Sequence, residues 1–259
     1  MKLQIFPTNL LQQYVQLVPK DLQKAFDQLS EAELSTDTFS FYTSVASVFS
    51  SKIEGESIDL DSYIKHKKFS VEFQPDYTKK TDDLYNTYIF AQHNPLNSDS
   101  VSEVHKLLSK HLVTESQQGK YRSQNRYVTT DDGRIEYVAA SPFEVKEEME
   151  KFYADMMHLI QEPMNIKEAF FFAAMAHLIF AKIHPWIDGN GRTARLIEKW
   201  FLSEKLGKKA WYLQSEKNYY RHHQLYYKNL RSLGLEYDQL DYSKALPFLL
   251  MLPESLFKV

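Results

Sequence analysis

The chain has 259 residues, with 31 Lys and Arg against 34 Asp and Glu, and it contains no cysteine. A net charge of -3 argues against nonspecific nucleic acid or an anionic membrane as the main partner. Without cysteine, disulfide frameworks and thiolate metal sites are excluded. The N-terminus lacks a secretory apolar run, and the most apolar stretch, residues 169–183, is shorter than the roughly 20 residues of a membrane span. We therefore expect a buried helix there and a cytoplasmic protein.

Between only seven glycines and nine prolines, apolar residues recur at intervals of three and four, which predicts a mostly helical, all-α fold. The expected helices span residues 10–17, 22–34, 38–53, 77–92, 101–114, 143–161, 166–183, 192–206, 216–233 and 243–252. One stretch differs: in "RYVTTDDGRIEYVAASP" two β-branched and aromatic runs flank Asp131-Asp132-Gly133, which predicts a β-hairpin. A lone hairpin needs a surface to pack on, so we expect a flap that projects from a helical body.

The stretch "IHPWIDGNGRTARLI", residues 183–197, joins the predicted buried helix to the next one. Pro185 ends the first helix, because its ring removes a backbone donor and disfavours helical geometry at His184. The glycine-lined turn then enters a helix whose first N–H groups have no partner inside it, and such an end attracts anions. Arg192 and Arg195, three residues apart, can face the same anion, which suits a polyphosphate.

A polyphosphate usually brings a divalent metal, normally Mg²⁺, and Asp188 is the nearest carboxylate for it. His184 can accept a proton from a hydroxyl at neutral pH, since the reference pKa of histidine is about 6.5. Taken singly, each of these residues also suits an ordinary turn or helix cap, but their conjunction favours a site. The signatures of P-loop, Rossmann, zinc-protease and serine-hydrolase sites are missing, and the spacing after Asp188 does not fit an EF-hand.

The run "HPWIDGNGRTAR" resembles the signature of the Fic family, HxFx(D/E)GNGRxxR, and differs only at Trp186, where the family usually has phenylalanine. We expect that larger ring to pack inward. The resemblance implies an all-α, Fic-type helical bundle with a small β-hairpin flap. It also implies a protein adenylyltransferase that moves AMP from ATP to a hydroxyl group. The related Doc kinases have lysine at the position of Gly191, so this glycine favours adenylylation over γ-phosphate transfer.

The resemblance further implies a role for each motif residue. His184 would deprotonate a Ser, Thr or Tyr hydroxyl of a target protein, and Asp188 would hold Mg²⁺ on ATP. The phosphates would be bound by Gly189, Asn190, Gly191, Arg192 and Arg195. Tyr226 and Tyr227 resemble a position near the adenine, although two core aromatics would give the same pattern. The segment "GKYRSQNRYV" and the hairpin resemble the target-docking flap, with Tyr127, Val128, Thr129, Ile135 and Tyr137.

A second match is "SSKIEGE", residues 50–56, which resembles the inhibitory motif (S/T)xxxE(G/N) with Ser50, Glu54 and Gly55. The alternative is a capping box, Ser51 to Glu54, that opens a helix. Gly55 favours the first interpretation, because glycine at this point suits a helix that ends. The resemblance implies that Glu54 pairs with Arg195 and blocks productive ATP binding, so that the enzyme is autoinhibited.

We accordingly expect an N-terminal helical region with the inhibitory motif at residues 1–95, a catalytic core at 96–213 and a C-terminal helical extension at 214–259. Two alternatives stay open: an enzyme that removes AMP or transfers another phosphate-containing group, and a non-catalytic helical interaction module. The expected partners are ATP with Mg²⁺ and an unidentified target protein, with no membrane and no nucleic acid. Self-modification and a homodimer are both compatible with the sequence.

Overall fold

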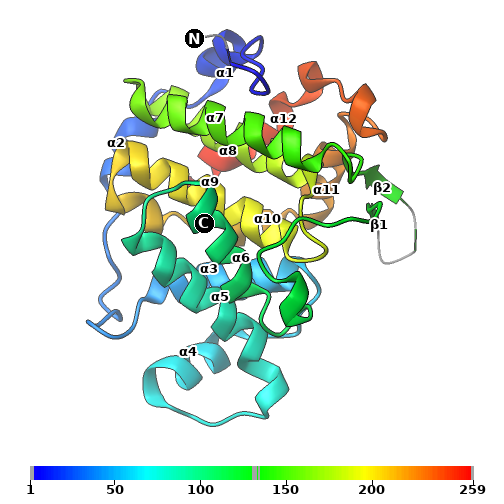
Figure 1. The fold of residues 1–259 in the computed structure, drawn as a ribbon. Helices are drawn as coiled ribbons and strands as arrows, with labels where there is room; N and C mark the ends of the chain where they lie inside the picture. The colour runs from blue at the N-terminus through cyan, green and yellow to red at the C-terminus, as the bar shows by residue number, and fades with distance from the viewer. Residues whose placement is uncertain (1–2, 130–132, 134, 258–259) are drawn as a thin grey trace.

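The computed structural model describes residues 3–129, 133 and 135–257. It is a bundle of helices with one two-stranded sheet (Figure 1). In its N-terminal half the helices are α1 Leu11–Leu17, α2 Leu22–Asp27, α3 Phe41–Ile53, α4 Leu60–Phe69, α5 Pro75–His93 and α6 Ser98–Leu108. After the sheet come α7 Val145–Gln161, α8 Ile166–Ile183, α9 Asn190–Leu206, α10 Ser215–Arg221, α11 His223–Arg231, α12 Leu246–Leu249 and α13 Met251–Glu254. Short 3-10 turns, η1 Glu115–Gln117, η2 Lys208–Tyr212, η3 Tyr237–Gln239 and η4 Tyr242–Lys244, complete the described chain.

Helix α8 is the centre of the molecule, as its uninterrupted apolar sequence predicts. It begins at a capping box formed by Asn165 and Glu168, and its residues from Ala169 to Ile183 are all buried. It packs most extensively on α9 and is also covered by α1, α7 and α12 (Figure 1). Within the described residues no helix is long and apolar enough to cross a membrane. The predicted buried helix at 166–183 is confirmed.

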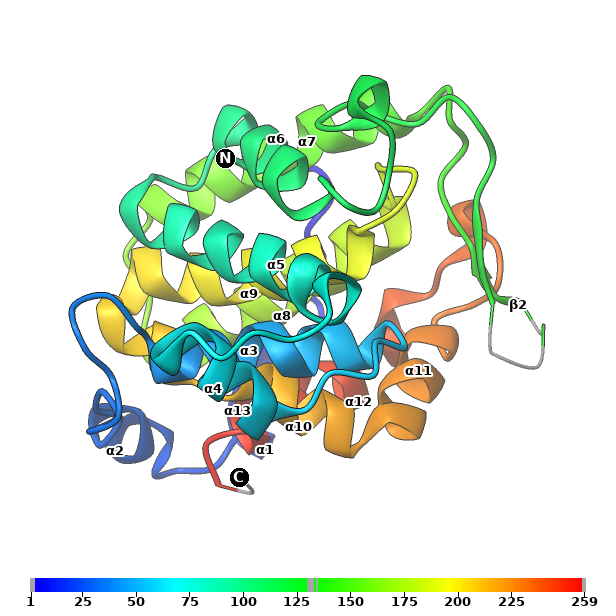
Figure 2. The same ribbon diagram turned by 90° about the horizontal axis from the view of Figure 1, so that it is seen from below.

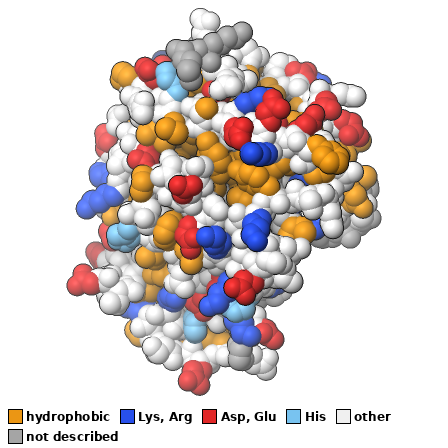
Figure 3. All heavy atoms as spheres, viewed as in Figure 1, with side chains coloured by type: hydrophobic (Ala, Val, Ile, Leu, Met, Phe, Trp, Pro, Cys, Tyr) orange, Lys and Arg blue, Asp and Glu red, His pale blue; other side chains and the backbone are white. Residues whose placement is uncertain are grey.

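One hydrophobic core runs through the chain from Phe6 to Leu252. Residues of all three predicted regions contribute to it, because α3 packs on α5 and α10 while α1 and α13 pack on α8. The three regions therefore share one folded body, and the boundaries between them stay a prediction. On the face shown in Figure 3, positive and negative side chains are interspersed, and hydrophobic side chains gather in its upper half.

The predicted hairpin is present and lies at one edge of the helical body (Figure 2). Strands β1 Tyr127–Thr129 and β2 Ile135–Val138 pair antiparallel, with an irregularity between Val128 and Thr129. The predicted turn residues Asp131 and Asp132 lie outside the described residues, whereas Gly133 has the positive φ of 81° that the prediction requires. Val138 N–H donates to Leu235 O at 2.8 Å, which ties the hairpin to the C-terminal part of the chain.

Four helix predictions need correction, and one helix was not expected. The helix expected at 101–114 spans Ser98–Leu108 instead. The helix expected at 22–34 ends at Asp27, and the chain then continues without helix to Ser40. Helix α4, in "LDSYIKHKKF", was not expected, because it buries only Tyr63 and most of its other residues are polar. The single helices expected at 216–233 and 243–252 are divided, the first at His222 into α10 and α11 and the second into η4, α12 and α13.

Candidate active site

The loop between α8 and α9 is held in a conformation that its sequence specifies. His184 caps α8 with a left-handed backbone, φ 54°, which is uncommon for a residue with a side chain. Gly189 caps α9 with φ 79°, and a Cβ there would lie 2.6 Å from Leu108. Asn190 closes the loop from inside: its Oδ1 accepts from Trp186 N–H at 2.8 Å and its Nδ2 donates to Trp186 O at 2.9 Å.

The start of α9 presents unpaired backbone donors, as the motif predicts. The first helical hydrogen bond runs from Thr193 N–H to Gly189 O, so the N–H groups of Asn190, Gly191 and Arg192 precede any intrahelical acceptor. The buried side chain of Asn190 is used in the loop, and only its backbone is left for an anion. The backbone groups of this turn could therefore bind an anion, with Arg192 and Arg195 on the helix behind it.

Two residues that the sequence analysis missed fix this loop. Arg122 is buried and donates from Nε to His184 O at 2.7 Å and from Nη2 to Ile183 O at 3.2 Å, and its backbone N–H donates to Pro185 O at 2.9 Å. His105 donates from Nε2 to Asp188 O at 3.0 Å, since its Nδ1 accepts from Gly119 N–H. Arg122 lies in the segment "GKYRSQNRYV", but its role there was not predicted, and His105 lies in no recognisable motif. Only the fold brings the two side chains to the loop.

Trp186 packs inward, as expected, and is 1% exposed. Its ring stacks on His105 with centroids 4.4 Å apart and on Tyr121 with centroids 5.0 Å apart. Burial lowers the pKa of His105 to about 4, so this imidazole is neutral at pH 7. The larger indole ring is accommodated in a stack beneath the loop.

His184 is oriented by the hairpin and by the end of α8. Its Nδ1 lies 3.4 Å from Ala181 O, a contact that requires the proton on Nδ1 and leaves Nε2 as an acceptor. Tyr137 hydroxyl lies 3.5 Å from the same Nδ1 and donates to Ala181 O at 3.0 Å. Burial lowers the pKa of His184 to about 4, and the nearby guanidinium of Arg122 adds to this effect. The imidazole is therefore neutral and in the tautomer of a general base.

The predicted pairing of Glu54 with Arg195 is present. Arg195 is fully buried and donates from Nη2 to Glu54 Oε1 at 2.6 Å and from Nε to Ser50 Oγ at 2.9 Å. Burial opposes the charge of both partners, but the pairing outweighs it: the pKa of Glu54 is lowered and that of Arg195 is raised. Helix α3 ends at Ile53, with Glu54 as its C-cap and Gly55 at φ 86°, so the ending-helix interpretation holds over the capping box.

The Glu54 carboxylate also lies over the glycine turn. A Cβ on Gly191 would collide with Glu54 Oε1, so the carboxylate fills the space next to this glycine. Arg195 Nη1 and Arg192 Nε are buried without a hydrogen-bond partner among the described residues. An acidic group thus already lies where the turn and the arginines would bind a phosphate, and donors are left over for further anionic oxygens.

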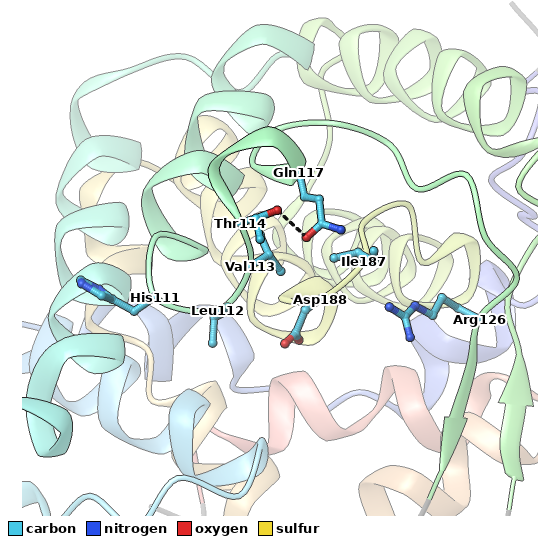
Figure 4. Close-up of a pocket in the computed structure, with 8 residues that line it drawn as sticks. All are labelled: His111, Leu112, Val113, Thr114, Gln117, Arg126, Ile187 and Asp188. Atoms are coloured by element: carbon cyan, nitrogen blue, oxygen red, sulfur yellow. Dashed lines mark hydrogen bonds between the residues drawn. The ribbon is translucent and has the colours of Figure 1, made fainter.

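Asp188 is exposed and borders a cavity of about 770 Å³ (Figure 4). The close-up shows Arg126 at the base of the hairpin pointing toward Asp188, with Ile187 above them in this view. Asp188 Oδ1 accepts from Gly189 N–H at 2.6 Å. Among the described residues no three His, Asp or Glu side chains gather into a ready metal site. One carboxylate suits Mg²⁺ that arrives with a nucleotide and keeps water and phosphate as its other ligands.

The remaining predicted residues fall into two groups. Tyr226 is buried with Tyr219 and Phe248, and its hydroxyl contacts His177 Nε2 at 2.9 Å. It also interacts with Arg195, so its position near the adenine stays a prediction. Tyr227 is partly buried beside it. On the hairpin, Tyr127, Thr129 and Ile135 are exposed and Val128 is half-buried, but Tyr137 is 3% exposed. At Tyr137, therefore, the backbone is available to a target and the side chain is not.

Residues 95–202 match the model of the Fic/DOC family. The chain is 29% identical over 112 residues to "Protein adenylyltransferase Fic" of Nematostella vectensis, a match that covers 43% of this chain and 24% of that protein. Among solved structures, a Fic family protein from Desulfovibrio desulfuricans superposes with a TM-score of 0.73 at 19% identity, covering 96% of this chain and 72% of that one. A Fic domain containing signaling protein from Bacteroides thetaiotaomicron gives 0.64 at 17% identity, covering 95% and 92%. Residues 95–202 therefore carry a Fic domain, and the comparisons support a Fic-family protein.

Proposed function

We propose that this protein is an adenylyltransferase that moves AMP from Mg²⁺-ATP to a hydroxyl of a target protein and that Glu54 holds it inactive. The observation that carries the proposal is the convergence of Glu54, Arg195 and Gly191 at the start of α9, with His184 at the end of α8. The relative from Nematostella vectensis is named for the same activity. The reaction, the target and the autoinhibition are proposals for this chain.

The chemistry follows from the residues of the loop. His184 Nε2 accepts the proton of the hydroxyl while the hydroxyl oxygen attacks the α-phosphorus of ATP. A new P–O bond forms to the target, the bond to the bridging oxygen breaks, and pyrophosphate leaves with the electron pair. The N–H groups at the start of α9, together with Arg192 and Arg195, would bind the β- and γ-phosphates. Mg²⁺ held by Asp188 would neutralise phosphate charge.

Glu54 opposes this arrangement because it occupies the same positive groups. A charge-assisted hydrogen bond contributes about 1.5 to 3 kcal/mol, which changes an equilibrium about tenfold to a hundredfold. A partner or a second ligand that contributes a similar free energy of binding could therefore displace the carboxylate. The proposed resting state has Glu54 on Arg195, and the active state has a phosphate there instead.

The test compares wild type, Glu54→Gly and His184→Ala with ATP labelled at the α or the γ position. Glu54→Gly is expected to transfer the α label to itself and to lysate proteins at least about tenfold faster than wild type. His184→Ala in that background is expected to abolish transfer. Labelling from the γ position would favour a kinase instead. Equal α labelling by wild type and Glu54→Gly would remove the proposed brake.

The non-catalytic alternative makes the opposite prediction for nucleotide binding. An interaction module has no need for buried, unpaired donors on Arg192 and Arg195 beside a glycine turn. Failure of Glu54→Gly to bind Mg²⁺-ATP would favour that alternative. Release of AMP from a labelled protein by wild type, but not by Glu54→Gly, would favour removal of AMP as the main activity.

A further inference from the structure

A second acidic side chain of the segment after α3 also reaches an arginine of α9. Glu56 Oε1 lies 3.5 Å from Arg192 Nη2 and 2.7 Å from Lys80 Nζ. A single carboxylate oxygen thus bridges a cation from α9 and a cation from α5. Helices α3 and α5 lie side by side (Figure 2), so α5 brings Lys80 to the segment that carries both acids.

The two acids of this segment occupy two neighbouring anion positions. Glu54 lies on Arg195 and Gly191, whereas Glu56 lies on Arg192 and Lys80. The Arg192 side chain is only 4% exposed, and its Nε has no partner among the described residues. Because a nearly buried guanidinium needs a counter-charge, the position between Arg192 and Lys80 suits an anionic oxygen whether or not Glu56 supplies it.

We infer that Lys80 is a phosphate-binding residue, which holds the terminal part of the nucleotide's polyphosphate together with Arg192 once Glu56 has left the position between them. The inference rests on the proposed function in taking ATP as the nucleotide. It adds a residue from outside the matched Fic domain to the nucleotide site. Glu56 is then a second competing carboxylate, which must move with Glu54 before ATP binds productively.

The charges support this exchange. Three cations, Arg192, Arg195 and Lys80, face two carboxylates in the present arrangement. Removal of both carboxylates without a replacement would leave three cations close together, which is unfavourable. A polyphosphate supplies several anionic oxygens at once and can satisfy all three. Lys80 is 40% exposed, so solvent weakens its contribution relative to that of the buried arginines.

The experiment measures binding of Mg²⁺-ATP and of AMP by calorimetry in the Glu54→Gly protein. Addition of Lys80→Ala is expected to raise the Kd of ATP about three- to tenfold, at the low end for a charge-assisted contact because of the exposure. The Kd of AMP, which lacks the terminal phosphates, is expected to change less than twofold. Lys80→Arg should restore most of the ATP affinity. Addition of Glu56→Gln is expected to lower the Kd of ATP about threefold.

The matched control is Lys79→Ala, which removes a neighbouring lysine that pairs on the surface with Asp76. Equal ATP affinities of the Lys80→Ala and Lys79→Ala proteins would overturn the inference, as would equal weakening of AMP and ATP. Weaker ATP binding in Lys80→Ala without any AMP transfer by the parent protein would refute the proposed function and leave the inference standing. Tripolyphosphate serves as a second probe, and failure of both probes to bind would overturn the two proposals together.

Discussion

Tyr137 and His184 share one acceptor, the carbonyl oxygen of Ala181, which lies 3.0 Å from the Tyr137 hydroxyl and 3.4 Å from His184 Nδ1. The tyrosine ring is itself held from behind, with Lys182 Nζ 4.0 Å from its centroid. The hairpin therefore contacts the imidazole at Nδ1 in addition to its predicted role in docking a target. The proposed base is oriented by a residue of the flap.

Replacement of Tyr137 by phenylalanine keeps the ring and removes this shared contact. We expect kcat for self-labelling by the Glu54→Gly protein to fall about three- to tenfold, because the imidazole loses an orienting partner. The KM for ATP should stay within twofold. Tyr42→Phe, far from the loop in sequence and packed on Tyr212, is the control and should leave kcat unchanged. A rise in KM alone would show that Tyr137 acts on the nucleotide instead.

The pH dependence of AMP transfer should follow the low pKa of His184. A base with the ordinary pKa of about 6.5 would lose half its activity near that pH, whereas burial lowers the pKa of His184 to about 4. We therefore expect kcat of the Glu54→Gly protein at saturating ATP to stay level from pH 8 to about 5.5. Loss of Glu54 should lower the pKa of His184 further, because the Glu54 carboxylate raises that pKa. An acid limb centred on pH 6.5 would contradict the assignment.

Arg122 should be a stability residue of the catalytic loop. Arg122→Lys removes the hydrogen bonds to His184 O and Ile183 O and leaves these carbonyl groups without their donor. We expect the free energy of unfolding to fall by about 2 to 4 kcal/mol, measured with urea. Arg126→Lys, four residues later and with no partner for Nε among the described residues, should cost less than about 1 kcal/mol. Equal losses would mean that the loop does not depend on the Arg122 contacts.

Lys182 should make the stability depend on pH in the alkaline range. It is fully buried without a hydrogen-bond partner among the described residues, and burial lowers its pKa from 10.5 to about 7. The unfolded chain binds this proton more tightly than the folded one, so the group destabilises the fold below about pH 7, and this penalty disappears as the pH rises toward 10.5. Lys182→Met should therefore stabilise the protein by about 1 to 3 kcal/mol at pH 7 and progressively less toward pH 10.

The control for Lys182→Met is Lys146→Met, on the exposed side of α7, where the side chain is 81% exposed. It should change the free energy of unfolding by less than about 0.5 kcal/mol at either pH. An equal gain from Lys182→Met at pH 7 and at pH 10 would point to better packing of the methionine and would exclude the buried charge as the cause.

The two helices that flank the catalytic loop could be predicted, because the residues that start and end them lie next to them in the sequence. Helix α8 has the predicted bounds, and α9 begins two residues before the predicted start. Pro185, Gly189 and Gly207 mark the ends of these helices in the sequence itself. The contact between Glu54 and Arg195 spans 141 residues and was expected only through the family resemblance. No periodicity or spacing in the chain would have paired these two side chains.

The contacts that tertiary structure alone creates could not be predicted. Arg122, His105 and Lys80 reach the site from segments far from the motif. His105 and Lys80 have unremarkable sequence neighbourhoods, and the flap-like segment around Arg122 did not indicate a contact with the loop. Helix α4 escaped prediction for a related reason: packing of Tyr63 against α3 and α5 stabilises it, while its local sequence is rich in lysine. Tyr137 was expected on the docking face, but burial along β2 does not alternate: Glu136 and Tyr137, on opposite faces of the strand, are both buried.

In the proposed mechanism, the position of Glu54 just beyond the end of α3 determines how the site would open. Its side chain is attached at a helix terminus followed by Gly55, whereas α3 itself is anchored on α5 and α10. A rotation about a few backbone angles can carry the carboxylate away while the anchored helix stays in place. The rate of this switching would be set by motion of the segment after α3, in the microsecond to millisecond range. It would not require α3, α5 or α10 to unfold.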